Sequence, residues 1–92
     1  MNHVAILIPP PMQRHTGNRA TIEVDASTVK EAMDTLDARY PGVGGRMFDA
    51  QGRLRHFLNV YVGSDDIRHL SGLDSAVRNG DEITILSAFA GG

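Results

Sequence analysis

The sequence predicts a small α+β domain with four to five short strands and one main helix. Residues 4–8 and 21–25 show the alternation of a half-buried strand, and they precede an amphipathic helix over residues 28–40. Two further segments rich in β-forming residues follow, at 55–62 and 82–86. A chain of 92 residues has room for one core and therefore one domain.

The first strand is predicted where Val4, Ile6 and Ile8 alternate with other residues, and it ends because three prolines (Pro9 to Pro11) cannot continue inside a sheet. A turn cluster at residues 15–18 separates it from the second strand. We therefore expect the chain to open with a hairpin whose loop is longer than two residues.

The helix is predicted to begin at Thr28, because Thr28 and Glu31 have the spacing of a capping box. Pro41 ends it, since a residue before proline avoids helical geometry. The residues that recur at helical spacing form one apolar stripe: Val29, Ala32, Met33, Leu36 and Tyr40.

In the second half, residues 46–48 are predicted to make a short turn that covers the core, and residues 55–62 to form a central strand. Residues 67–70 are expected to be a short edge strand and residues 73–77 one helical turn. The turn at Asn79, Gly80 and Asp81 leads into the last strand. We expect a domain over residues 1–86 and a flexible tail over residues 87–92.

Composition excludes several function classes. A formal net charge of -2 argues against sequence-independent binding of nucleic acid. No apolar run approaches the roughly 20 residues of a membrane helix, and no signal peptide is evident, so a cytoplasmic location is expected. The chain has no cysteine, and its four histidines lack metal-ligand spacing, so no metal site is expected. No catalytic residues are expected, because so short a chain rarely forms a deep active-site pocket.

The sequence ends in Ala90, Gly91 and Gly92. Small residues at a chain end are often only a frayed terminus. However, a glycine pair has no side chain beside the terminal carboxylate, and it can pass through a narrow tunnel in which any Cβ would clash. These residues therefore form a candidate reactive tail.

The order of elements, the run from Asn79 to Leu86 and the terminal Gly91-Gly92 together resemble the MoaD/ThiS family of ubiquitin-like sulfur carriers. The resemblance spans nearly the whole chain and implies a β-grasp fold, in which a mixed sheet wraps around one helix. It is greatest to the CysO-type branch, which serves cysteine synthesis, on residues 49–62 and the ending at residues 86–92. Molybdopterin-synthase subunits more often carry two prolines where Ser87 and Ala88 stand here.

The family resemblance implies that partner enzymes carry out the chemistry. An E1-like adenylyltransferase/sulfurtransferase would use ATP and Mg to adenylate the carboxylate of Gly92, and sulfur would then replace AMP to give a thiocarboxylate. A pyridoxal-phosphate (PLP)-dependent cysteine synthase or another acceptor enzyme would take the sulfur. The chain itself would bind no cofactor.

Three alternatives to a cysteine-pathway carrier remain open: a carrier for molybdopterin or thiamine, a ubiquitin-like modifier conjugated to lysines, and a β-grasp interaction module with no chemistry at its terminus. In each case we expect partners to dock beside the tail. If Ile83 and Ile85 point inward, alternation turns Leu86 outward, where it would form the docking surface with Phe89.

Overall fold

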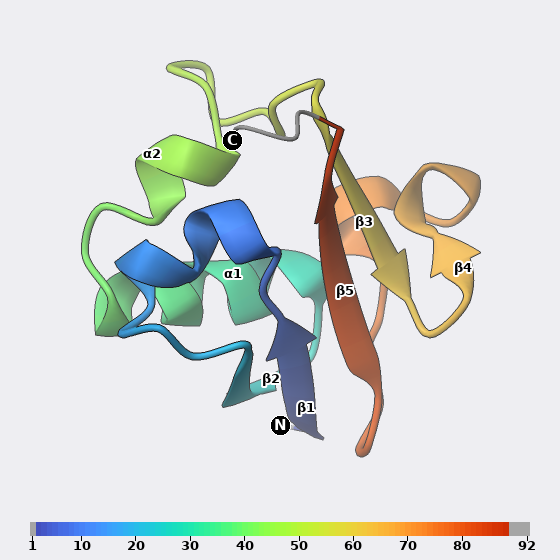
Figure 1. The fold of residues 1–92 in the computed structure, drawn as a ribbon. Helices are drawn as coiled ribbons and strands as arrows, with labels where there is room; N and C mark the ends of the chain where they lie inside the picture. Colours follow the sequence, from blue (N-terminus) through green and yellow to red (C-terminus); the bar gives the residue numbers. More distant parts are fainter. Residues whose placement is uncertain (1, 89–92) are drawn as a thin grey trace.

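The computed structural model describes residues 2–88 as a five-stranded sheet packed against one main helix (Figure 1). This confirms the α+β prediction. The strands are β1 (Asn2–Leu7), β2 (Thr21–Ala26), β3 (Leu58–Val62), β4 (Asp65–Asp66) and β5 (Glu82–Ser87). The helices are α1 (Val29–Arg39), the short α2 (Gly44–Met47) and three 3-10 helices, η1 (Pro10–His15), η2 (Ile67–His69) and η3 (Gly72–Asp74).

The strand order is β2-β1-β5-β3-β4, and the sheet is mixed. β1 pairs antiparallel with β2 but parallel with β5, whereas β3 pairs antiparallel with both β5 and β4. β5 therefore occupies the middle of the sheet. The sequence analysis had predicted that the strand at residues 55–62 would be the central one. β3 lies one place nearer the edge.

One face of the sheet and one stripe of α1 form the core. Alternate residues of β1, β3 and β5 point to the same side and are buried, as Val4, Val60 and Ile85 illustrate. Val29, Ala32, Met33 and Leu36 are each 0% exposed, so the predicted apolar stripe of the helix is confirmed. The helix spans 11 residues, and no helix within residues 2–88 is long and apolar enough to cross a membrane.

The start of α1 has the predicted capping interactions. The backbone N–H of Glu31 donates to the hydroxyl of Thr28 (3.2 Å), and the Glu31 carboxylate accepts from the backbone N–H of Ser27 (2.7 Å). The first bond satisfies an N–H group that a helix start would leave unpaired, and the second satisfies the N–H group of the residue before the cap. The carboxylate reaches one residue further back than in the simplest capping box.

The predicted edge strand at residues 67–70 is wrong. Asp65–Asp66 forms the edge strand β4, and Ile67–His69 is a 3-10 turn. The Asp66 carboxylate accepts hydrogen bonds from the backbone N–H of Arg68 (2.9 Å) and from its guanidinium (2.6 Å). These bonds lower the pKa of Asp66 to about 2, and they hold the chain in a turn where a strand would need to stay extended.

The last strand is one residue longer than predicted. β5 includes Ser87, and the backbone N–H of Ala88 donates to the carbonyl of Phe57 (2.8 Å). The sequence analysis placed both residues in the tail. Residues 89–92 lie outside the described residues, so the predicted domain boundary is not tested there.

We expect Thr28→Ala to lower the free energy of unfolding by about 1 kcal/mol, because it removes the hydroxyl that accepts from the start of α1. Denaturant unfolding followed by circular dichroism measures the change. Thr35→Ala, the same substitution inside α1, is the matched control and should be nearly neutral. Equal losses in both variants would contradict the capping role.

Candidate functional site

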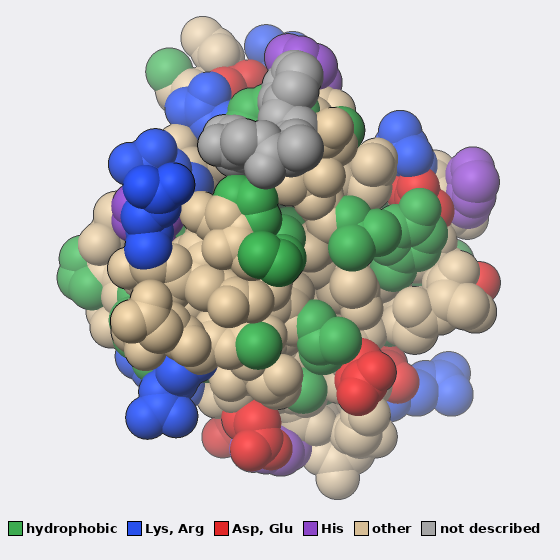
Figure 2. Space-filling model, in the orientation of Figure 1, with side chains coloured by type: hydrophobic (Ala, Val, Ile, Leu, Met, Phe, Trp, Pro, Cys, Tyr) green, Lys and Arg blue, Asp and Glu red, His purple; other side chains and the backbone are tan. Residues whose placement is uncertain are grey.

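The sheet has one face that α1 does not cover. In β5, Ile83 and Ile85 are buried at 0% and 1% exposure, whereas Leu86 is 47% exposed. The prediction that alternation turns Leu86 outward is therefore confirmed. In Figure 2, hydrophobic side chains lie over β5 and β3 on this side of the molecule.

Neighbouring strands extend this surface. Thr84 of β5 lies opposite Leu7 of β1 on one side and Tyr61 of β3 on the other, and all three are partly exposed. The sequence analysis missed Leu7 and Tyr61, although each follows a buried residue in an alternating strand. We call six of the residues on this side of β1, β3 and β5 the outer sheet face: Ala5, Leu7, Asn59, Tyr61, Thr84 and Leu86.

The end of β5 is fixed to the segment that precedes β3. Ser87 pairs with Leu58, and the Ala88 N–H is bonded to the Phe57 carbonyl. The Phe57 ring in turn makes an edge-to-face contact with His56, at 6.0 Å between centroids. The backbone is therefore held in place up to Ala88, directly beside the outer sheet face. The other predicted site residues lie outside the described residues: Phe89, Ala90, Gly91 and Gly92.

A cavity of about 250 Å³ lies between the free edge of β2 and the end of α1. Its walls are polar, and the Arg39 guanidinium donates to the Glu23 carbonyl (2.8 Å) beside it. Pockets that enclose small molecules usually measure about 300–1,000 Å³ and are mostly apolar. This cavity therefore does not resemble a cofactor site. Its lining residues are Arg19, Thr21, Ile22, Glu23, Arg39 and Tyr40.

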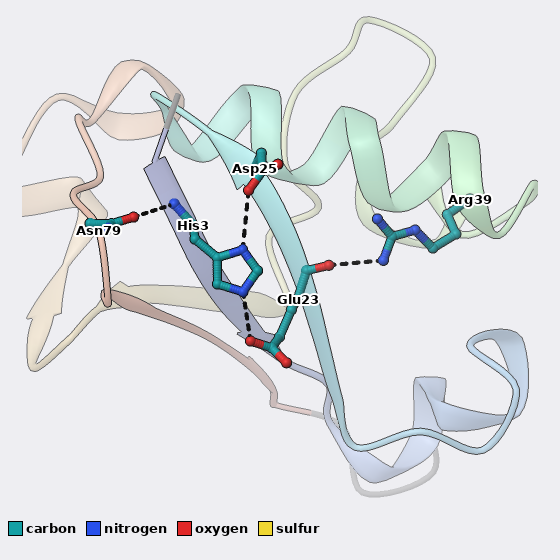
Figure 3. Close-up of polar contacts among 5 residues, drawn as sticks. All are labelled: His3, Glu23, Asp25, Arg39 and Asn79. Atoms are coloured by element: carbon teal, nitrogen blue, oxygen red, sulfur yellow. Dashed lines mark hydrogen bonds and ion pairs between the residues drawn. The ribbon is translucent and has the colours of Figure 1, made fainter.

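A charged cluster lies at the end of the sheet opposite to Ala88 (Figure 3). The ring of His3 contacts Glu23 through Nε2 (2.7 Å) and Asp25 through Nδ1 (3.1 Å), while the His3 backbone N–H donates to Asn79 (2.7 Å). These two hydrogen bonds raise the pKa of His3, and the bond to Glu23 has the larger effect. Within residues 2–88, no three His, Cys, Asp or Glu side chains are placed to hold a metal ion.

A mixed sheet around one main helix, whose central strand runs towards the C-terminal residues, defines a ubiquitin-like β-grasp protein. The sequence matches the ThiS family over residues 6–92. The chain belongs to this family, which confirms the resemblance to MoaD/ThiS sulfur carriers.

Similar proteins cover nearly the whole chain. The sulfur carrier protein CysO of Mycobacterium tuberculosis is 36% identical over 92 residues, which span 98% of this chain and 99% of that protein. A chain in the crystal structure of the Amycolatopsis orientalis BexX/CysO complex superposes with a TM-score of 0.89 at 38% identity, covering 97% of this chain and 99% of that one. Small archaeal modifier protein 3 of Haloferax volcanii is 31% identical over 68 residues, or 74% of this chain and 73% of that protein.

We expect Leu86→Ser to leave the free energy of unfolding nearly unchanged and to weaken binding to an activating enzyme by about tenfold, because the side chain is exposed on the outer sheet face. Calorimetric titration and denaturant unfolding measure the two effects. The adjacent buried residue gives the control: Ile85→Ala should cost about 2–5 kcal/mol of stability. A Leu86→Ser variant that unfolds easily but binds normally would contradict this assignment.

We expect the thermal midpoint of the native chain to decrease when the pH is raised from about 6 to about 9. The thermal midpoint of His3→Gln should decrease less over the same pH range. The raised pKa means that folding favours the imidazolium. Its stabilising effect is complete below the unfolded pKa of about 6.5, and it disappears as the pH rises through the higher folded value. The His3 and Glu23 side chains are 59% and 65% exposed, so the effect should be small and weaken with salt. Parallel pH profiles for both proteins would rule it out.

Proposed function

We propose that this chain is a sulfur carrier and not an enzyme, and that the carboxylate of Gly92 holds the sulfur. The observation that carries the proposal is membership of the ThiS family, with a match that extends over residues 6–92 and so includes Gly91 and Gly92. The 36% identity to the sulfur carrier protein CysO supports the same role.

The carrier cycle follows from carboxylate chemistry. A carboxylate is a poor electrophile, so an E1-like enzyme joins Gly92 to AMP from MgATP and releases pyrophosphate. A hydrosulfide ion then attacks the acyl carbon, the bond to AMP breaks, and loss of the proton from sulfur leaves a thiocarboxylate. The chain has no cysteine, so none of its own side chains supplies a competing thiol.

The residues before Gly92 suit entry into a partner's active site. Gly91 has no Cβ, so the backbone can pass through a narrow channel, and Ala90 adds only a methyl group. Phe89 and Leu86 would hold the carrier against its partner, with Leu7 and Tyr61 extending the contact on the outer sheet face. Docking of this kind makes the reaction at the tail effectively intramolecular.

The sulfur is proposed to go to cysteine, through a PLP-dependent synthase. The name CysO on relatives that match along their full length supports this branch over molybdopterin or thiamine. The crystallised BexX/CysO complex is consistent with a carrier of this type docking on a partner protein. The cytoplasm, where ATP-dependent activation takes place, is the proposed location.

A second candidate function is conjugation to lysines of other proteins. The 31% identity to small archaeal modifier protein 3 favours it, and both functions begin with the same adenylate. A tagged chain that appears in high-molecular-weight conjugates resistant to reductant would show the modifier role. Loss of those conjugates on deleting Gly92 would assign them to the same tail.

Incubation with its E1-like enzyme, MgATP and sulfide should increase the mass of the chain by the difference between sulfur and oxygen, about 16 Da, at Gly92. Intact-mass and fragment mass spectrometry measure the change. Deleting Gly92, or adding one residue after it, should abolish the gain without changing the thermal midpoint, because the buried core cluster of the described residues runs from Val4 to Ile85.

Gly91→Val should slow sulfur loading by about tenfold or more, because a branched side chain would block the partner's channel. Ala38→Val is the control, since Ala38 is exposed on α1, outside the outer sheet face, and the substitution introduces the same branched side chain there. Sulfur loading of the extended and truncated chains at the native rate would refute the carrier proposal.

A further inference from the structure

Basic and acidic side chains are unevenly distributed along this chain. Residues 9–19 and 44–57 contain five of the nine basic residues and a single acid, Asp49. The rest of the chain has four basic residues and ten acids, although the overall net charge is only -2. The five arginines are Arg14, Arg19, Arg46, Arg53 and Arg55.

The sheet topology brings these two segments to one end of the molecule. β1 and β5 run parallel with Leu7 opposite Thr84, so η1, which follows β1, lies at the end of the sheet towards which β5 runs. Leu7 also pairs with Thr21, which places Arg19 at the same end. The Ala88 N–H donates to the Phe57 carbonyl, so Phe57, which closely follows Arg53 and Arg55 in the chain, lies beside the last described residue of the C-terminal segment.

Hydrogen bonds hold part of this surface in shape. The Arg55 backbone N–H donates to the Met47 carbonyl (2.8 Å), and its side-chain Nε donates to the Gly45 carbonyl (3.1 Å). Both bonds fix the segment to α2, which carries Arg46. The side chains of Arg14, Arg46 and Arg53 are exposed. We call this surface, defined by the five arginines, the basic end.

Acidic residues occupy the other end of the sheet. Asp81 and Glu82 stand at the start of β5, Asp65 follows β3, and Asp25 lies near the end of β2. Figure 2 shows blue side chains over η1 and α2, and red side chains beside the first residues of β1 and β5, where some blue side chains also lie. The molecule therefore has a charge dipole along the direction of its central strand.

We propose that the basic end is a docking surface for an acidic protein surface that surrounds the entrance to a partner's active site. This inference rests on the proposed function, because the partner is the enzyme that acts on Gly92. The dipole turns the basic end, and with it the exit of the C-terminal residues, towards the acidic entrance before contact. Steering of this kind acts on the association rate and weakens as salt screens the charges.

The charge distribution favours a protein over a nucleic acid as the occupant. Five arginines lie around one end, but the remainder of the molecule is strongly acidic and would repel a long phosphate backbone. A local acidic rim on a protein meets only the basic end. The apolar outer sheet face beside it then supplies the contact that holds the complex together.

The test measures binding of the native chain to its purified E1-like enzyme by stopped-flow fluorescence, without ATP, between about 25 and 400 mM NaCl. We expect the association rate of the native chain to fall steeply with salt. At low salt, R14E/R46E should associate at least about tenfold more slowly, and the difference should close at high salt. Unchanged thermal midpoints verify that the variants are folded.

R46E is compared with R78E, which makes the same charge change at the acidic end. Only R46E should slow association. The proposal would be overturned if the two variants had equal effects, if the association rate did not depend on salt, or if the native chain did not bind the enzyme. It would also be overturned if the native chain bound a single-stranded oligonucleotide and R14E/R46E did not. Sulfur loading is measured separately. If association is salt-dependent but the mass of the chain does not increase, only the carrier function is refuted. If the mass increases but association does not depend on salt, only the docking role of the basic end is refuted.

Discussion

The parallel pairing of β1 with β5 determines most of the architecture. The first and last strands meet in the middle of the sheet, with Ile6 beside Ile83, and both side chains are fully buried. Every intervening element must then be accommodated on either side of this pair. β2 lies on one side of the pair, β3 and β4 lie on the other, and α1 packs against the inner face of the sheet. Because chain ends that are distant in sequence form the centre, the fold closes only when the whole domain has assembled.

The same pairing separates the two faces of the sheet by function. The inner face is completed by α1 and supplies the core, so its residues are committed to packing. The outer face has no such cover, and its polar and apolar residues are available for contact with a partner. A single alternating strand, β5, therefore buries Ile83 and Ile85 in the core and exposes Leu86 on the outer sheet face.

Local patterns in the sequence were sufficient to predict the helix, the opening strands and the outward orientation of Leu86. Thr28 and Glu31 lie close together in sequence, and strand alternation needs no knowledge of the partner strand. The 3-10 turn after Asp66 was missed, because the sequence of residues 67–70 does not reveal the hydrogen bonds of Asp66 to Arg68 that determine the conformation. The central position of β5 and the basic end depend on contacts between distant segments, which periodicity cannot reveal. The uneven charge distribution was the available signal for the latter.

The hydrogen bond between Ala88 and Phe57 also sets a length scale for catalysis. Four residues follow Ala88 up to Gly92, and a fully extended chain of that length spans at most about 14 Å. An enzyme that reacts at Gly92 while this bond is intact must keep its nucleotide and its sulfur donor within that depth of the docked domain. The fold thus limits how deeply the active site of a compatible partner can be recessed.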